Sequence, residues 1–146
     1  AFLMQHGIEV ETVPGITAVL GCGAASGIPM THRDVSQAVT FITGHGDGDL
    51  SLDWKALAQL GHTLVIYMGL IGLETICQQL IKNGMLATMP IAIVQQGTTQ
   101  RQRVVVGTLL DMPDKVKLAE LKAPCLTIIG EVVQLREKLN WFNPEI

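Results

Sequence analysis

Three glycine-containing turns, centred on Gly15, Gly69 and Gly97, stand where strands are expected to end. In open α/β sheets, ligands bind beyond the carboxyl ends of the strands. Glycine there lets backbone N–H and C=O groups approach a ligand without a Cβ in the way, and Thr17 and Thr98 add hydroxyls beside two of the turns. The pattern indicates a nucleoside-like ligand, into which a side chain at Gly97 would intrude. Each turn alone is equally compatible with an ordinary strand–helix connection.

Basic residues near these turns suit an anionic partner. His32 and Arg33 lie in the loop 29–34, and Arg101 and Arg103 follow the third turn. Strand alternation would put the two later arginines on one face, where a pair can capture carboxylates or phosphates in bidentate fashion. A solvated loop and two exposed arginines on an edge strand are the alternative interpretation.

Other chemistries lack their residue patterns. The serines Ser26, Ser36 and Ser51 have no nucleophile-elbow context, and the histidines and cysteines lack the spacing of a zinc site. The glycine-rich run 21–27 resembles a dinucleotide-binding loop, but it lies inside an expected helix rather than directly after a strand. Residue patterns alone therefore lead to a binding site and identify no catalytic acid, base or nucleophile.

The elements that must position these residues alternate along the chain. Strands are predicted at 8–13, 38–43, 63–67, 91–95, 103–109 and 125–130, and helices at 16–26, 52–60, 70–83, 112–121 and 132–141. Such alternation implies an α/β sheet covered by helices. Residues 96–102 are too few for a helical crossover between two strands, so that pair is predicted to be antiparallel. We expect a mixed sheet of about five strands flanked by helices.

The composition narrows the class of protein. Hydrophobic residues make up 48% of the 146 residues, enough for a packed core, and the net charge of −3 argues against a nucleic-acid binder. No apolar run reaches the roughly 18 residues that indicate a membrane span. The three distant cysteines, Cys22, Cys77 and Cys125, are expected to be buried free thiols of a cytoplasmic protein.

The first seven residues resemble the last turn of a helix that stops at Gly7. No N-cap or first turn precedes them. We therefore expect this chain to be a truncated part of a longer protein, unable to turn over a substrate alone.

Several motifs, in order and correctly spaced, resemble the uroporphyrinogen-III C-methyltransferases of the S-adenosylmethionine (SAM)-dependent tetrapyrrole methylase family. They are the segments Glu11–Ala18, Ala25–Asp34, Thr43–His45, Tyr67–Gly69, Gly97–Thr99, Gln102–Val104, Gly130–Val133 and Leu135–Phe142. The resemblance covers nearly the whole chain. Two departures are Gln100, where proline is common, and the glycine- and aspartate-rich loop 46–49, which we expect to be unusually flexible.

The resemblance implies a two-lobed α/β enzyme, usually a homodimer, that methylates uroporphyrinogen III twice to give precorrin-2. Residues 1–36 would be a remnant of the lobe junction and residues 37–146 the C-terminal lobe. The proposed acid and base residues would belong to the N-terminal lobe, which this sequence lacks. The alternatives are a methyltransferase of the same fold that acts on a later corrin intermediate, and a non-catalytic binding or dimerisation module.

The resemblance also implies the residues of two sites. Contacts to SAM, and to the product S-adenosylhomocysteine (SAH), carry over mostly as backbone contacts, whereas the tetrapyrrole carboxylates would meet basic and polar side chains. The implied cofactor residues are Thr17, Ala18, Met68 and Gly97, and the implied substrate residues are Thr31, His32, Arg33 and Arg103.

Overall fold

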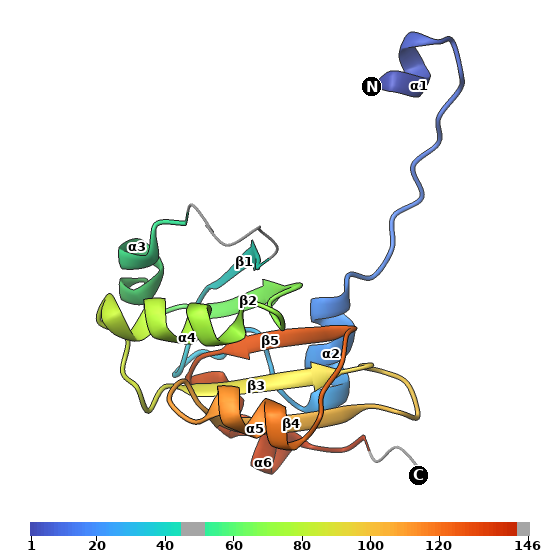
Figure 1. Ribbon diagram of the computed structural model, residues 1–146. Helices are drawn as coiled ribbons and strands as arrows, with labels where there is room; N and C mark the ends of the chain where they lie inside the picture. The colour runs from blue at the N-terminus through green and yellow to red at the C-terminus, as the bar shows by residue number, and fades with distance from the viewer. Residues whose placement is uncertain (45–51, 143–146) are drawn as a thin grey trace.

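A five-stranded mixed sheet forms the centre of the computed structural model, which describes residues 1–44 and 52–142 (Figure 1). The strands are β1 Val39–Thr43, β2 Thr63–Tyr67, β3 Pro90–Gln95, β4 Arg103–Thr108 and β5 Cys125–Ile129, in the order β1-β2-β5-β3-β4. Only β1 and β2 are parallel. The mixed sheet and the antiparallel β3–β4 pair are thus confirmed. The loop 46–49, predicted to be flexible, lies outside the described residues.

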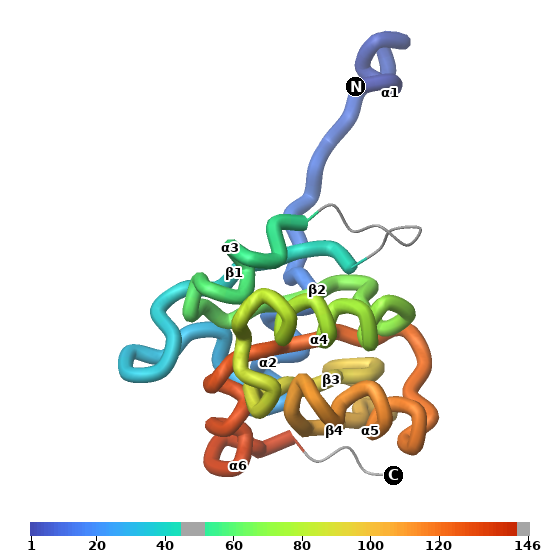
Figure 2. Tube along the Cα trace, turned by 60° about the vertical axis from the view of Figure 1, so that its left-hand side comes forward, coloured from blue at the N-terminus to red at the C-terminus, as the bar shows by residue number. Residues whose placement is uncertain are grey.

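Helices cover both faces of this sheet (Figure 2). They are α1 Phe2–Gln5, α2 Ala18–Ser26, α3 Trp54–Gln59, α4 Leu73–Lys82, α5 Met112–Leu118, the 3-10 helix η1 Glu131–Leu135, and α6 Arg136–Leu139. Helices α3, α4 and α5 pack on one face, and α2 with η1 packs on the other. The longest described helix has ten residues, so none could cross a bilayer, which needs about 20.

Strand alternation divides the core between the two faces. On β2, Leu64 and Ile66 join the cluster under α3, α4 and α5, whereas Val65 joins the cluster under α2. On β3, Ile93 and Val94 divide in the same way. Successive side chains of a strand point to opposite faces, so strands buried on both faces need continuous apolar runs, and β3 is buried along its whole length. The two layers of helices therefore fix the sheet from both sides.

Residues 1–17 form an arm that leaves the body of the domain (Figures 1 and 2). Helix α1 ends before Gly7, which has a φ of +71°, as the expected glycine stop requires. The predicted strand 8–13 is wrong: this segment pairs with no strand of the described chain, and residues 1–18 are all exposed. Its apolar–polar alternation fits a strand, but a strand forms only where a partner supplies the ladder of hydrogen bonds.

The segment after β5 holds the carboxyl end of α2. The helix predicted at 132–141 is shorter and irregular, being the 3-10 helix η1 followed by the single turn α6. From this segment the Trp141 indole donates to the Ala24 carbonyl at 2.9 Å, and the Arg136 guanidinium donates to the Ser26 carbonyl. The last carbonyls of a helix lack partners within it, so these side chains satisfy them from far along the sequence.

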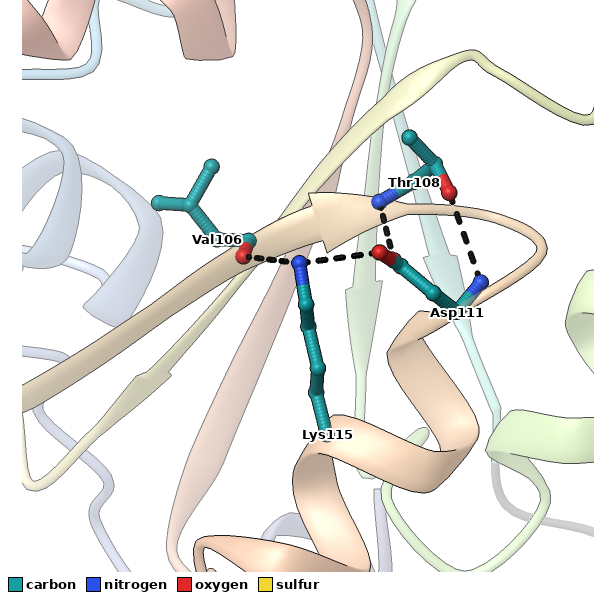
Figure 3. A network of polar contacts seen from close by, with 4 residues as sticks. All are labelled: Val106, Thr108, Asp111 and Lys115. Carbon is teal, nitrogen blue, oxygen red and sulfur yellow. Dashed lines mark hydrogen bonds and ion pairs between the residues drawn. The ribbon is translucent and has the colours of Figure 1, made fainter.

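A reciprocal pair of hydrogen bonds joins β4 to α5 (Figure 3). The Thr108 N–H donates to Asp111 Oδ1 at 2.6 Å, and the Asp111 N–H donates to Thr108 Oγ1 at 3.3 Å. The exchange of hydrogen bonds resembles that of a capping box, but it closes the turn between the last residue of β4 and the N-cap of α5, and it caps no N–H of the helix. Lys115 Nζ completes the junction by contacting Asp111 Oδ2 at 2.9 Å and the Val106 carbonyl at 3.2 Å.

Candidate functional site

A cavity of about 1490 Å³ opens at one edge of the sheet. Strands β2 and β5 are antiparallel to each other, so the carboxyl end of β2 and the amino end of β5 lie together at this edge, where Tyr67 pairs with Leu126. The end of β3 lies beside them, with Gln95 paired to Cys125. The start of α2 forms a further wall. The cavity therefore lies where ligands bind in open α/β sheets.

The four residues implied for the cofactor all line this cavity. They come from three parts of the sequence that converge there: Thr17 and Ala18 from the start of α2, Met68 from the turn after β2, and Gly97 from the turn after β3. The structure thus brings the four together; their role as ligand contacts stays a prediction.

Tyr67 fixes the start of α2 against the end of β2. Its hydroxyl lies 2.5 Å from Thr17 Oγ1 and accepts a hydrogen bond from the Val19 N–H at 3.2 Å. Thr17 itself makes no side-chain cap to its helix, so Tyr67 satisfies an N–H that the helix leaves free. The segment Tyr67–Gly69 is recognisable as a motif, but no role for the Tyr67 hydroxyl can be read from the sequence, because a capping contact across about 50 residues leaves no local pattern.

The two turns that follow β2 and β3 contain strained backbone. Met68, Gln96 and Thr98 have φ angles of +53°, +47° and +69°. Non-glycine residues rarely adopt this left-handed conformation, and a β-branched threonine there is an outlier. Each such residue costs of order 1–3 kcal/mol and persists only where surrounding structure imposes it, often at ligand sites. All three of these strained residues line the cavity.

Gly97 is required by protein packing. A Cβ built on Gly97 would collide with Cys22 Sγ and lie 3.2 Å from Val94 Cγ1. Next to Cys22 on α2, a Cβ on Gly21 would lie 3.1 Å from Thr98 Cγ2. A side chain at Gly97 was expected to intrude on a ligand. In the structure it would first collide with Cys22 of α2. The two glycines let the helix approach the turn closely.

Two thiols also line the cavity. Burial raises the pKa of the Cys22 thiol, and burial with a smaller contribution from Cys22 raises the pKa of Cys125 to about 11. Both thiols, and the buried Cys77, are free. Because their pKa values lie above the ordinary range, they stay protonated and weakly nucleophilic at neutral pH. Cys125 is only half-buried, which departs from the expected full burial.

The four residues implied for the substrate do not line this cavity. Thr31 lines a smaller cavity that lies against a different set of α2 residues and extends past the carboxyl end of the helix, and His32 and Arg33 are exposed in the loop beyond it. Arg103 begins β4 and donates to the Ala119 carbonyl at the end of α5. The substrate assignment stays a prediction that the geometry of the cavity does not support.

Arg101 and Lys122 are the basic residues that line the main cavity. Arg101 lies in the turn rather than on β4, so the prediction that it shares a strand face with Arg103 is wrong. Lys122 precedes β5, and sequence analysis missed it because the direction of β5 was not known. Among the described lining residues no carboxylate accompanies them. Nor does the described part of the chain hold a cluster of metal-ligating side chains.

Comparison with known proteins agrees with this architecture. The model of the tetrapyrrole (corrin/porphyrin) methylases matches residues 1–113. Siroheme synthases of Thioalkalivibrio sulfidiphilus and Methylobacillus flagellatus are each 57% identical over 143 residues, which is 97% of this chain. Those residues are 29% and 31% of the two relatives, so the chain spans less than a third of their length.

Solved structures share the fold. Uroporphyrin-III C-methyltransferase from Thermus thermophilus, solved with S-adenosylhomocysteine, is 33% identical, with a TM-score of 0.76 over 92% of this chain and 58% of that one. The cobalt precorrin-4 methyltransferase CbiF has a TM-score of 0.82 at 21% identity, over 90% of this chain and 56% of that one. By sequence and by fold, the chain belongs to the tetrapyrrole methylase family.

Proposed function

We propose that this chain is the cofactor-holding part of a SAM-dependent uroporphyrinogen-III C-methyltransferase of sirohaem or cobalamin biosynthesis. The observation that carries the proposal is the convergence of Thr17, Ala18, Met68 and Gly97 on one cavity. The structure from Thermus thermophilus, 33% identical over most of this chain, was solved with SAH, and the siroheme synthases support the pathway.

The cavity fits a nucleoside with a charged tail. Its volume exceeds the 300–1,000 Å³ of a typical small-molecule pocket, which leaves room for part of a second reactant. Apolar side chains such as Val94 and Leu126 suit a purine, and Thr17 and Thr99 bring hydroxyls.

The proposed mechanism needs positioning more than an activated side chain. SAM, when bound, would supply an electrophilic methyl group. A pyrrole carbon of uroporphyrinogen III would attack the methyl carbon, SAH would leave with the electrons of the broken C–S bond, and the macrocycle would release a proton. A second SAM would methylate a second pyrrole carbon, giving precorrin-2 by way of precorrin-1. Holding two reactants in line can lower the activation free energy by several kcal/mol. In this chain the start of α2 and the strained turns would hold one reactant. The exposed apolar side chains of Met68 and Ile71 would exclude water when the other arrives.

The tetrapyrrole carboxylates need cationic partners. We assign Arg101 and Lys122 to this role because they line the cavity. The implied set Thr31, His32, Arg33 and Arg103 remains a second proposal, for a substrate that reaches around α2. No residue of the described chain is proposed as the catalytic acid or base.

The proposal includes a cytoplasmic homodimer, as the family resemblance implies. The exposed apolar side chains of Phe2, Val13 and Ile16 on the arm need a covering surface. A second copy of the protein, or the remainder of a longer chain, would provide one. Sedimentation equilibrium would distinguish a dimer from a monomer.

Calorimetric titration of SAH into two variants, each with one alanine of α2 replaced by phenylalanine, tests the cofactor site. Ala18→Phe would fill the cavity from the first turn of α2, whereas Ala24→Phe makes the same change at an exposed position near the other end of the helix. We expect Ala18→Phe to weaken SAH binding at least about 10-fold, or 1.4 kcal/mol, and Ala24→Phe to leave it unchanged. The titration uses the longest reading frame that contains this chain.

Two results would contradict the proposal. Failure of the unaltered protein to bind SAH would remove the cofactor assignment. Methyl transfer to a later corrin rather than to uroporphyrinogen III, seen in the product mass, would keep the cofactor and change the substrate.

A further inference from the structure

Gln102 joins the two walls of the cavity through one buried amide. The residue is 7% exposed. Its Oε1 accepts a hydrogen bond from the Thr98 N–H at 2.7 Å, and its Nε2 donates to the Ala25 carbonyl at 3.1 Å. One partner lies in the turn after β3 and the other near the carboxyl end of α2.

The two partners fix the orientation of the amide. A backbone N–H can only donate and a backbone carbonyl can only accept, so the oxygen must face Thr98 and the nitrogen Ala25. An ionised glutamate could satisfy the first partner alone, and an aliphatic side chain neither. Buried polar groups that lose a partner cost about 1–3 kcal/mol each. Glutamine at position 102 is therefore favoured over glutamate and over an aliphatic residue.

The partner in the turn, Thr98, has a strained backbone conformation that contacts with other residues must stabilise. Thr98 has a φ of +69°, a conformation that threonine rarely adopts. Its Oγ1 bonds to the adjacent Gly97 carbonyl at 2.6 Å, which is a contact within the turn. The Gln102 amide ties the turn to an element outside it, and strained residues persist where such contacts impose them.

The other partner sets the position of α2. Ala25 lies between Ala24 and Ser26, whose carbonyls are held by Trp141 and Arg136. Those two side chains connect the helix to the carboxyl-terminal segment, whereas Gln102 alone of the three connects it to the cavity turn. A helix moves largely as one body, so the anchor at Ala25 also places Ala18 and Cys22 at the cavity.

We propose that Gln102 is a positioning residue that sets the register of α2 against the turn 96–101 and so shapes the ligand cavity. It contacts no ligand and acts through Thr98 and α2. The inference rests on the proposed function only in the choice of SAH as probe.

Gln102→Met tests this with two measurements, because methionine keeps the length of the side chain and removes both hydrogen bonds. By amide hydrogen exchange, the Thr98 N–H should exchange about 10-fold faster or more, while the Val94 N–H in β3 keeps its protection. The amide chemical shifts of Ala18 and Cys22 should change. SAH affinity should fall about 10-fold.

Trp141→Phe is the matched control. It removes one hydrogen bond to the same end of α2, at Ala24, and leaves the turn untouched. We expect unchanged Thr98 exchange and an SAH affinity within about 2-fold of the original protein. Gln102→Glu, measured at a pH high enough to ionise the buried carboxyl group, separates the two bonds, since the carboxylate still accepts from Thr98 and repels the Ala25 carbonyl. It should preserve Thr98 protection and still shift Ala18 and Cys22.

The proposal is overturned if Thr98 exchange and the α2 shifts are unchanged in Gln102→Met, or if Trp141→Phe weakens SAH binding equally. Should Gln102→Met fail to fold, the Gln102→Glu pattern decides. Should the unaltered protein fail to bind SAH, the proposed function falls, and the exchange and chemical-shift measurements still decide the role of Gln102.

Discussion

Close approach between α2 and the turn after β3 depends on two residues without side chains. Gly97 faces Cys22, and Gly21 faces Thr98. Gly97 can be assigned to a ligand-binding turn from the sequence, because a glycine after a strand is a recognisable turn signal. It could not identify what the glycine approaches, since Cys22 is distant in sequence and belongs to a helix whose packing has no local signature.

Gly97→Ala should destabilise the fold through this contact. Forcing extra volume into a packed site typically costs about 1–3 kcal/mol, and we expect a cost in that range by chemical denaturation. In a Cys22→Ala background, where Sγ is gone, at least about half of the cost should disappear, since contacting residues couple.

Gly15→Ala is the control, because a Cβ at Gly15 has no neighbour within 4 Å; it should change stability little. Equal costs of Gly97→Ala with and without Cys22 would show that the glycine serves something other than this contact.

At the scale of elements, apolar periodicity identified all five strands of the sheet, with boundaries that differ by two residues or fewer at each end. The signal was strong because β2, β3 and β5 are buried on both faces and need unbroken apolar runs. It failed for residues 8–13, whose alternation has no partner strand in the described chain, and for 132–141, where η1 replaces a regular helix. Local pattern reports which side chains are apolar and does not report which strands meet.

The β4–α5 junction gives a prediction with a defined pH dependence. The hydrogen bond from the Thr108 N–H, together with Lys115, holds the pKa of Asp111 below its ordinary value of 3.8. A lowered folded-state pKa contributes stability that is present above 3.8 and is lost as pH falls through the lower value. Asp111→Asn should therefore cost about 0.5–1 kcal/mol near neutral pH, the range of one exposed hydrogen bond with a screened surface ion pair.

The difference between the two proteins should vanish in acid, where Asp111 is protonated. Urea denaturation at neutral and at acidic pH measures it. Asp114→Asn is the control, because Asp114 is on the same helix, is 88% exposed and has Lys117 only at 4.0 Å; it should show almost no pH-dependent cost. A cost for Asp111→Asn that persists unchanged in acid would contradict the assignment.

At the scale of the whole molecule, the charges of the chain and of its cavity oppose each other. The chain carries a net charge of −3, whereas the described lining of the main cavity has two cations and no carboxylate. Net charge governs long-range steering, and local groups govern a bound contact. The sequence indicates Arg33 and Arg103 as substrate residues, whereas Arg101 and Lys122 line the cavity, because position along the chain does not show which basic residues converge after folding.

Arg101→Ala and Arg33→Ala together decide where an anionic substrate lies. Both remove one positive charge from an exposed arginine, one at the main cavity and one beyond the far end of α2. A charge-assisted hydrogen bond is worth roughly 1.5–3 kcal/mol, and exposure places Arg101 at the low end. We therefore expect Arg101→Ala to raise the KM for uroporphyrinogen III about 10-fold in steady-state methyl transfer by the longest reading frame. Arg101→Lys should recover part of the loss, since an ammonium keeps the charge and lacks the planar fork.

Measuring the KM of Arg101→Ala and of Arg33→Ala at two ionic strengths provides a further test. Added salt should raise the KM of the unaltered protein more than that of Arg101→Ala, because screening weakens an attraction that the variant has already lost. Arg33→Ala should keep both the original KM and the original salt dependence. The opposite result, with Arg33→Ala impaired and Arg101→Ala unaffected at both ionic strengths, would place the substrate carboxylates at the loop 29–34. The tetrapyrrole would then have to extend along α2 instead of lying at the cavity mouth.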